Sequence, residues 1–360
     1  MISELPEWSE LFGDGDPALE MRLVRKHGEP LMLLPASAAD AASCLDLYPA
    51  QTAKARIARA ILRALIRLPV LERVRLPFSE TTPFAAFLRS FAKDHFPQFG
   101  ALLGNPRVDG RRWIFLCLNR SGLPALVVKA GVSDKARELI AAEGDFLATL
   151  PAEFPGRPDL VGQLRDPQVH ALACRYAPGS SPRPDRCESR LAALLGGWIT
   201  SEQRIPLRDL PAWRRLADAL ACEPIFIRIE HKLDGLMVAT TVMHGDLAPW
   251  NIREHRGAWT VLDWERGVLH GIPGWDWFHF MLQYAVLVER RSPGALLFTV
   301  DTILGSAAFQ DYAKRTGIAG HERALLLAYL LHCTSVLKIT EGSREIAALF
   351  KLLSDQWRND

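Results

Sequence analysis

The chain has 360 residues, of which 49% are hydrophobic and 23% charged, a composition typical of a globular protein. A chain of this length is expected to hold about two or three domain-sized units. Its formal net charge of +2 argues against binding to nucleic acid. Six cysteines without a CxxC pair disfavour a disulfide framework or a zinc site and favour a reduced, cytoplasmic compartment. The acidic N-terminus lacks the apolar core of a signal peptide, and no apolar run is long enough for a transmembrane segment.

We divide the chain into three parts, without an internal repeat. Residues 1–95 mix short apolar runs with prolines, and we treat them as an N-terminal extension of unknown role. Residues 96–177 carry short runs rich in aromatic and β-branched side chains, which predict antiparallel strands. Residues 178–360 are mostly helical in pattern and begin with the linker-like stretch PGSSPRP. The predicted class is therefore α+β, with a strand-rich first half and a larger helical second half.

One clear helix is predicted in the first part, from Ala53 to Leu68, and Pro69 stops it. Its apolar side chains form one stripe, made of Ile57, Ile61, Leu65 and Ile66. Its arginines form a second stripe, made of Arg56, Arg59, Arg63 and Arg67. Such a helix can lie on an anionic membrane or bind an anionic partner. The more ordinary explanation, which we favour, is a helix whose apolar stripe packs on the core while its charged face is solvated.

The second part has the local signals of a small sheet followed by a helix. The runs Trp113–Leu118 and Ala125–Lys129 are predicted strands, flanked by the turn sequences VDG and NRSG. A helix should follow from Ser133, which is a suitable N-cap, to Leu150, with Pro151 beyond its end.

The most informative stretch is VMHGDLAPWNIREHRGAWTVLDWE, residues 242–265, where a short apolar run leads into a polar loop. Asn251 follows Asp246 by five residues, and Asp263 follows Asn251 by twelve. The segment between Asn251 and Asp263 has the pattern of a hairpin that turns at residues 255–257. Such a hairpin would bring Asn251 and Asp263 to the same end of a site.

These three side chains suit the transfer of a phosphoryl group. Its transition state is loose and charged, so a catalyst mainly supplies positioning and countercharge. A carboxylate near the attacking hydroxyl must accept its proton, and Asp246 suits this role. A second carboxylate and an amide oxygen suit Mg²⁺, which prefers hard oxygen ligands, so we predict Asn251 and Asp263 as metal ligands. Any one of the three alone would be better explained as a turn or cap residue, and only their joint spacing supports the prediction.

Three motifs in this region resemble those of the aminoglycoside phosphotransferase and choline kinase family. HGDLAPWN (residues 244–251) resembles the catalytic loop of the family, VLDWE (261–265) its metal-binding strand end, and GIPGWDWF (271–278) the segment that opens the next helix. The resemblance implies a bilobal protein-kinase-like fold, with a small antiparallel-sheet N-lobe and a larger helical C-lobe. It also implies that His244 stabilises the catalytic loop, and that Asp276 either braces this loop or caps its own helix.

The resemblance further implies a lysine that binds the nucleotide phosphates and is held by a glutamate from the next helix. Lys129, at the end of the predicted strand, is the candidate, although a lysine at a strand end can also reach into solvent. On the helix 133–150, Glu143 shares a stripe with apolar side chains, whereas Glu138 lies on the opposite face. A carboxylate on a buried stripe needs a cationic partner, so we predict that Glu143 pairs with Lys129.

The remainder of the nucleotide site has weaker signals. The resemblance implies a phosphate-binding loop, which we place from Gly104 to Gly110 although no G-x-G-x-x-G pattern is present. It also implies that the base of ATP or GTP bonds to backbone groups of Cys174, Tyr176 and Ala177, just before the linker.

We therefore predict an Mg²⁺-dependent phosphotransferase that moves the γ-phosphoryl group of ATP or GTP to a hydroxyl of a small molecule. Two alternatives remain. One is a nucleotide-binding pseudokinase or scaffold whose first 95 residues bind a partner, which the intact catalytic residue types disfavour. The other is an enzyme of the same fold that modifies a protein or transfers AMP. The short segment from Asp263 to Asp276 disfavours a protein kinase, because little chain is available for an activation loop.

Overall fold

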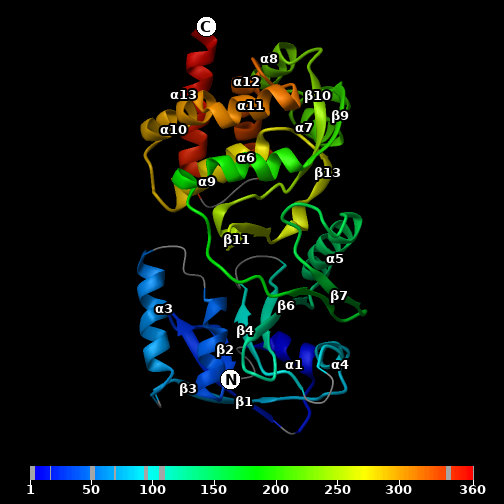
Figure 1. Ribbon diagram of the computed structural model, residues 1–360, viewed down its shortest axis with the longest axis vertical. Helices are drawn as coiled ribbons and strands as arrows, with labels where there is room; N and C mark the ends of the chain where they lie inside the picture. The colour runs from blue at the N-terminus through cyan, green and yellow to red at the C-terminus, as the bar shows by residue number, and fades with distance from the viewer. Residues whose placement is uncertain are drawn as a thin grey trace. The chain divides into compact units, whose positions relative to one another are not determined.

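The structure is a computed structural model that describes residues 5–16, 18–48, 53–68, 70–92, 96–104, 110–337 and 342–359 (Figure 1). The chain divides into two compact units, each described here by itself. The N-terminal unit comprises Met1–Leu150 and Pro158–Ala177, and the C-terminal unit comprises Pro151–Arg157 and Pro178–Asp360.

The N-terminal unit is built on an eight-stranded sheet in which each recorded neighbouring pair is antiparallel. The strand order is β3-β1-β2-β4-β5-β6-β8-β7. The strands are β1 (Ala18–Lys26), β2 (Glu29–Pro35), β3 (Glu72–Pro77), β4 (Phe99–Leu103), β5 (Trp113–Leu118), β6 (Pro124–Gly131), β7 (Leu160–Arg165) and β8 (His170–Arg175).

Both faces of this sheet bury apolar side chains, because successive residues of a strand point to opposite faces. In β2, Leu33 belongs to one hydrophobic core, whereas Met32 and Leu34 belong to another. The first core also holds side chains of α1 (Pro6–Phe12) and α4 (Pro83–Ser90). The second holds side chains of α2 (Ala38–Ser43) and of the α3 segment (helix Ala53–Leu65). A further helix, α5 (Asp134–Thr149), begins after the predicted N-cap Ser133 and packs against β6, β7 and β8.

The first 95 residues share a core and a sheet with the strands that follow them. Phe12 lies at the centre of an aromatic cluster, with ring centroids 4.5–5.9 Å away in Trp8, Phe78, Phe84, Phe99 and Phe115. In the sheet, β2 pairs with β4 through Met32↔Leu102 and Leu33↔Ala101. The sequence analysis set these residues apart as an extension, whereas in the structure they supply three of the eight strands.

The prediction of which apolar stripe of α3 is buried is wrong. Ile66 is fully buried, but Ile57 and Ile61 are 61% and 54% exposed. The buried side of this segment is formed by Leu62 and Ile66 instead. The helix therefore lies on the core with a face different from the one that the sequence pattern indicated.

The C-terminal unit is mainly helical, as predicted. Its helices are α6 (Glu188–Gly197), α7 (Pro211–Leu220), α8 (Pro224–Lys232), α9 (Trp275–Leu287), α10 (Pro293–Gly305), α11 (Ala307–Thr316), α12 (Glu322–Leu331) and α13 (Ser343–Asn359). A three-stranded sheet has the order β13-β10-β9, and β11 pairs with β12 in a hairpin. These strands are β9 (Ile199–Pro206), β10 (Met237–Met243), β11 (Ile252–His255), β12 (Ala258–Val261) and β13 (Val268–Gly271).

Two of these elements position the polar loop that the sequence analysis singled out. β10 is buried at all but its first residue, so the loop that follows it begins in the interior of the C-terminal unit. α9 is buried on almost all sides, as expected of a helix that is apolar around its whole circumference. Within the described residues, no helix has both the length and the apolar character to cross a membrane. The antiparallel sheet and the helical C-terminal unit confirm the predicted α+β class.

Candidate active site

The polar loop begins where β10 ends, and its backbone requires a glycine. Gly245 has φ +77, in the left-handed region that side chains rarely adopt. A Cβ atom at this position would lie 2.9 Å from the backbone oxygen of Arg266. Gly245 therefore allows the loop to turn sharply against residue 266 and to present Asp246.

Asp276 braces the loop from the first turn of α9. Its two carboxylate oxygens accept hydrogen bonds from the backbone N–H groups of His244, at 2.7 Å, and of Gly245, at 3.0 Å. Burial raises the pKa of Asp276, and these two hydrogen bonds oppose the rise in part. The sequence left open whether Asp276 braces the catalytic loop or caps its own helix. In the structure it braces the loop.

His244 ties the loop to the returning strand. Its Nε2 lies 2.8 Å from the backbone oxygen of Leu262, and its Nδ1 accepts the backbone N–H of Asp246 at 3.2 Å. An imidazole that accepts at Nδ1 carries its proton at Nε2, so Nε2 donates to Leu262. The ring also packs on buried Trp264, with centroids 4.8 Å apart. These contacts hold the side chain inside the loop.

The β11–β12 hairpin brings Asn251 to the segment that leads to Asp263. Ile252 pairs with Val261, and the backbone N–H of Leu262 donates to the oxygen of Asn251 at 2.7 Å. The side-chain Nδ2 of Asn251 donates to the backbone oxygen of Asp246 at 2.9 Å. Because the nitrogen is used in this way, the amide oxygen of Asn251 is the atom left to accept or to bind a cation.

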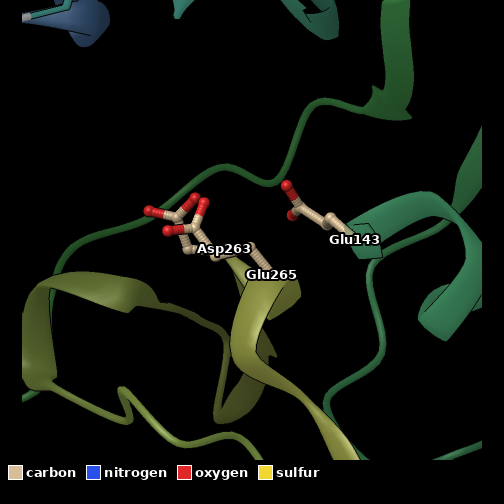
Figure 2. A group of neighbouring side chains, drawn as sticks. All are labelled: Glu143, Asp263 and Glu265. Atoms are coloured by element: carbon tan, nitrogen blue, oxygen red, sulfur yellow. The ribbon is translucent and has the colours of Figure 1, made fainter. Parts of the chain in front are cut away.

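Asp263 and Glu265 lie side by side on the turn that follows β12, and Figure 2 shows both carboxylates. Asp263 itself has a left-handed backbone, with φ 69, directly before the short 3₁₀ helix Trp264–Arg266. Carboxylate and amide oxygens are hard donors of the kind that Mg²⁺ prefers, and Asp263, Glu265 and Asn251 supply such oxygens within the C-terminal unit. The sequence analysis did not single out Glu265 as a metal ligand. The available signal was that this carboxylate follows Asp263 by only two residues in the sequence.

His279 is a residue of this site that the sequence analysis missed. Its Nε2 lies 3.0 Å from Oδ1 of Asp246, and its side chain is 5% exposed. Burial raises the pKa of Asp246, but the hydrogen bond from His279 and the charge of Arg266 outweigh burial and leave this pKa below its ordinary value. The Arg266 guanidinium contributes from 3.9 Å.

The other side of the His279 ring is held by Tyr329 of α12. The Tyr329 hydroxyl lies 2.9 Å from Nδ1 of His279, and both side chains are buried. Burial raises the pKa of Tyr329 well above its ordinary value, so the phenol keeps its proton and can donate to Nδ1. An ionised Asp246 only accepts, so Nε2 of His279 must carry the proton that faces it. Asp246, His279 and Tyr329 thus form a hydrogen-bonded chain within the C-terminal unit.

In the N-terminal unit, Lys129 and Glu143 form the ion pair that the helix pattern predicted. The Lys129 Nζ lies 2.7 Å and 2.6 Å from the two carboxylate oxygens of Glu143. Glu143, which Figure 2 also labels, is buried, with a side chain that is 3% exposed. Glu138 is on the exposed face of α5, where it pairs with Lys135 instead.

The other predicted nucleotide residues are placed as follows. Gly104 directly follows β4 and donates its backbone N–H to the oxygen of Arg112 at 3.0 Å, while residues 105–109 of the predicted phosphate loop lie outside the described residues. Cys174 is within β8, between β6 and β7. The backbone N–H of Tyr176 donates to Ala125 at 2.8 Å, and Ala177 ends the N-terminal unit. Their contacts with a nucleotide base stay a prediction.

No protein-family model and no curated protein matches this sequence. Solved structures do match it. The macrolide 2′-phosphotransferase MphH from Brachybacterium faecium, as apoenzyme, is 18% identical, over 73% of this chain and 97% of that one, with a TM-score of 0.44. A thermostable mutant of aminoglycoside phosphotransferase APH(4)-Ia, in a ternary complex with ADP and hygromycin B, is 11% identical over 76% and 98%, with a TM-score of 0.48. The streptomycin–ATP–APH(2″)-IIa ternary complex is 13% identical over 73% and 91%, with a TM-score of 0.41. The first two are phosphotransferases by name, the class whose motifs this sequence resembles.

Proposed function

We propose that this protein is a small-molecule kinase, which transfers the γ-phosphoryl group of ATP or GTP to a hydroxyl group. The observation that carries the proposal is the arrangement of Asp246, Asn251 and Asp263 around the β11–β12 hairpin. One carboxylate is held by a neighbouring imidazole, and a second carboxylate and an amide oxygen lie at the end of the hairpin. Phosphoryl transfer needs both functions, a carboxylate near the attacking hydroxyl and oxygen ligands for the metal ion at the phosphates.

In the proposed reaction, the acceptor hydroxyl attacks the γ-phosphorus while its proton moves to Asp246. A new oxygen–phosphorus bond forms, the bond from the γ-phosphorus to the bridging oxygen breaks, and the nucleoside diphosphate leaves. Asn251 and Asp263 would hold Mg²⁺, which neutralises charge on the phosphates. Lys129, held by Glu143, would bind the phosphates from the N-terminal unit. His244 and Asp276 would keep the catalytic loop in place.

The pKa of Asp246 lies below its ordinary value, so this carboxylate is ionised at neutral pH and can accept a hydrogen bond from the acceptor hydroxyl and orient it for attack. A small acceptor is favoured over a protein because the chain from Asp263 to Asp276 is already folded as a 3₁₀ turn and the short strand β13. Those elements leave little chain there that could bind a substrate polypeptide as an activation loop does.

The proposal is tested by mass spectrometry of a mixture of hydroxylated metabolites, incubated with the protein, Mg²⁺ and either ATP or GTP. A gain of about 80 Da on one acceptor is expected, which marks a phosphoryl group rather than AMP. Asp246→Asn is the matched control: it keeps the size of the side chain, removes the base, and should lower turnover by about 10²–10⁴-fold while nucleotide binding persists.

Two results would overturn the proposal. If the protein binds Mg²⁺ with nucleotide but modifies no acceptor and hydrolyses no nucleotide, it is a nucleotide-binding scaffold. If the acceptor gains a nucleotide instead of a phosphoryl group, the site acts on the α-phosphorus and the assignment of leaving group is wrong.

A further inference from the structure

The α3 helix and the residues just after it carry an unusual concentration of exposed apolar side chains. Twelve large hydrophobic residues of the described chain are recorded as exposed, and four of them lie between residues 57 and 70. They are Ile57 (61% exposed), Ile61 (54%), Leu68 (51%) and Val70 (60%). Scattered single apolar residues are normal on a surface, but a cluster of this kind indicates an interaction site.

The exposed apolar residues of α3 form a continuous stripe along the helix. Ile57 and Ile61 are one turn apart, and the exposed Ala60 and Ala64 fall on the same face. Leu68 and Val70 continue the apolar surface just beyond the last turn. The stripe therefore runs from Ile57 through the rest of the helix, and apolar side chains continue past its C-terminal end.

This stripe is not a core face that has failed to pack, because the opposite side of the segment is firmly attached. Leu62 and Ile66 are buried in the second core of the sheet. The guanidinium of buried Arg22, in β1, donates to the backbone oxygen of Ile66 at 2.6 Å and to that of Ala36 at 2.8 Å. The orientation of the helix is thus determined by its buried side, and Ile57 and Ile61 face outward as a result.

Cationic side chains flank the stripe, and no acidic residue occurs from residue 53 to residue 71. The cations are Lys54, Arg56, Arg59, Arg63 and Arg67. These five charges compare with a net charge of +2 for the whole chain, so the rest of the chain carries −3. Arg63 and Arg67 are exposed beside the apolar stripe, whereas Arg59 lies 4.0 Å from Asp46.

We propose that α3 is a membrane-docking helix, which lies flat on an anionic lipid surface. In this orientation Ile57 and Ile61 enter the boundary between headgroups and acyl chains, and Arg63 and Arg67 contact lipid phosphates. A lipid surface fits better than a protein partner because residues 53–71 offer only apolar and cationic side chains, and this stretch has no carboxylate that would set the register of a partner chain. One short helix with these features gives reversible binding that depends on lipid charge and on salt.

The test is sedimentation of the full-length protein with vesicles of phosphatidylcholine, with and without phosphatidylglycerol. We expect binding to the phosphatidylglycerol vesicles only, and weaker binding as salt is raised. The double variant Arg63→Gln/Arg67→Gln should bind about thirtyfold more weakly, since each basic residue near the surface contributes about a fivefold factor. The variant Ile57→Gln/Ile61→Gln should lose at least about tenfold, because the inserted apolar area is removed.

Matched controls separate docking from general surface effects. Ile227→Gln removes an isoleucine that is 52% exposed on α8, and Arg186→Gln/Arg208→Gln removes two arginines that are each 74% exposed elsewhere. Both controls should bind vesicles like the wild type, and all variants should melt at the wild-type temperature.

Three outcomes would overturn the proposal. One is no binding to anionic vesicles at low salt. Another is equal loss of binding in the control variants. The third is a dimer in analytical ultracentrifugation that Ile57→Gln/Ile61→Gln abolishes without any vesicle binding, which would assign the face to a second copy of the chain.

Discussion

The imidazole of His279 holds one oxygen of the Asp246 carboxylate, with Nε2 and Oδ1 3.0 Å apart. The second oxygen, Oδ2, lies 3.5 Å from the amide nitrogen of Asn251. The carboxylate is thus held at Oδ1 by a strong contact and at Oδ2 by a longer one. Oδ2 is therefore the atom better placed to take the proton of an acceptor hydroxyl. Tyr329 holds the far side of the imidazole, so the position of Asp246 depends on a side chain more than 80 residues further along the chain.

Replacing His279 should slow the transfer step without weakening nucleotide binding. We expect His279→Ala to lower kcat by about 10–100-fold, because a carboxylate that is free to rotate spends less time in the reactive geometry. His279→Gln keeps an N–H donor near the position of Nε2 and should recover part of the loss. Steady-state kinetics that separate kcat from the KM for nucleotide provide the measurement.

The same contact chain predicts a smaller effect for Tyr329→Phe, which removes only the bond to Nδ1. Its kcat should fall by less than that of His279→Ala and in the same direction. A positioning role for His279 is contradicted if the alanine variant matches the wild type in kcat, or if only its melting temperature changes.

Glu143→Gln should weaken nucleotide binding, whereas Glu138→Gln should not. The first change removes the buried charge that holds Lys129, and breaking such a pair costs roughly 3 kcal/mol of stability. The second removes the partner of Lys135 on an exposed face of the same helix. Isothermal titration with ATP and GTP should show at least about a tenfold loss for Glu143→Gln alone. Equal affinities for the two variants would mean that Lys129 does not bind the phosphates.

Removal of Mg²⁺ and loss of Asp263 should have the same consequence. The protein should gain thermal stability with Mg²⁺ plus nucleotide, because a ligand that binds the folded state raises the melting temperature. We expect EDTA to abolish this gain, and Asp263→Asn to abolish it without EDTA. Asp311→Asn, which changes an aspartate that is 76% exposed on α11, should keep the full gain. An undiminished gain in Asp263→Asn would remove this residue from the set of metal ligands.

His332 should make the stability of the protein depend on pH between about 4 and 6.5. Burial lowers the pKa of His332 from 6.5 to about 4, with Arg266, His279 and Arg215 acting in the same direction. In this range the unfolded chain binds a proton at this residue that the folded protein does not. The free energy of unfolding therefore decreases as the pH falls through it, by an amount on the order of 3 kcal/mol.

Urea denaturation of the wild type and of His332→Gln at pH 7 and pH 4.5 measures this effect. The ring of His332 packs on Trp275, with centroids 4.9 Å apart, so the variant should be less stable at pH 7. The difference between the two proteins should shrink or reverse at pH 4.5, because the variant has no imidazole to protonate. A difference that is the same at both pH values would show that His332 titrates normally in the folded protein.

Features that depend on a few neighbouring residues could be predicted from the sequence. The hairpin around residues 255–257 and the cap at Ser133 follow from local turn and capping chemistry, and both are present. The choice of Glu143 over Glu138 also needed only the helical period, since a helix has one buried side. The loop from His244 to Asn251 could be identified because its residues lie close together in the sequence, in a spacing that resembles a known catalytic motif.

Features that depend on contacts between distant segments could not be predicted. His279 meets Asp246 only because α9 packs beside the end of β10, and an isolated histidine in an aromatic helix carries no local signal. The pairing of β2 with β4 is equally non-local, since about 65 residues separate the two strands. On α3, the sequence pattern indicated a stripe with Ile57 and Ile61, whereas contacts with distant segments bury Leu62 and Ile66 instead.

The pairing of β2 with β4 has a practical consequence for any shortened form of this protein. A chain that began near residue 96 would keep every residue of the proposed catalytic machinery and would still lose the neighbour of β4. The strand would become an open sheet edge with unpaired backbone groups, and Phe99 would lose the stacked ring of Phe12. Exposed edges of this kind recruit other strands, so such a fragment should self-associate instead of folding as a minimal kinase.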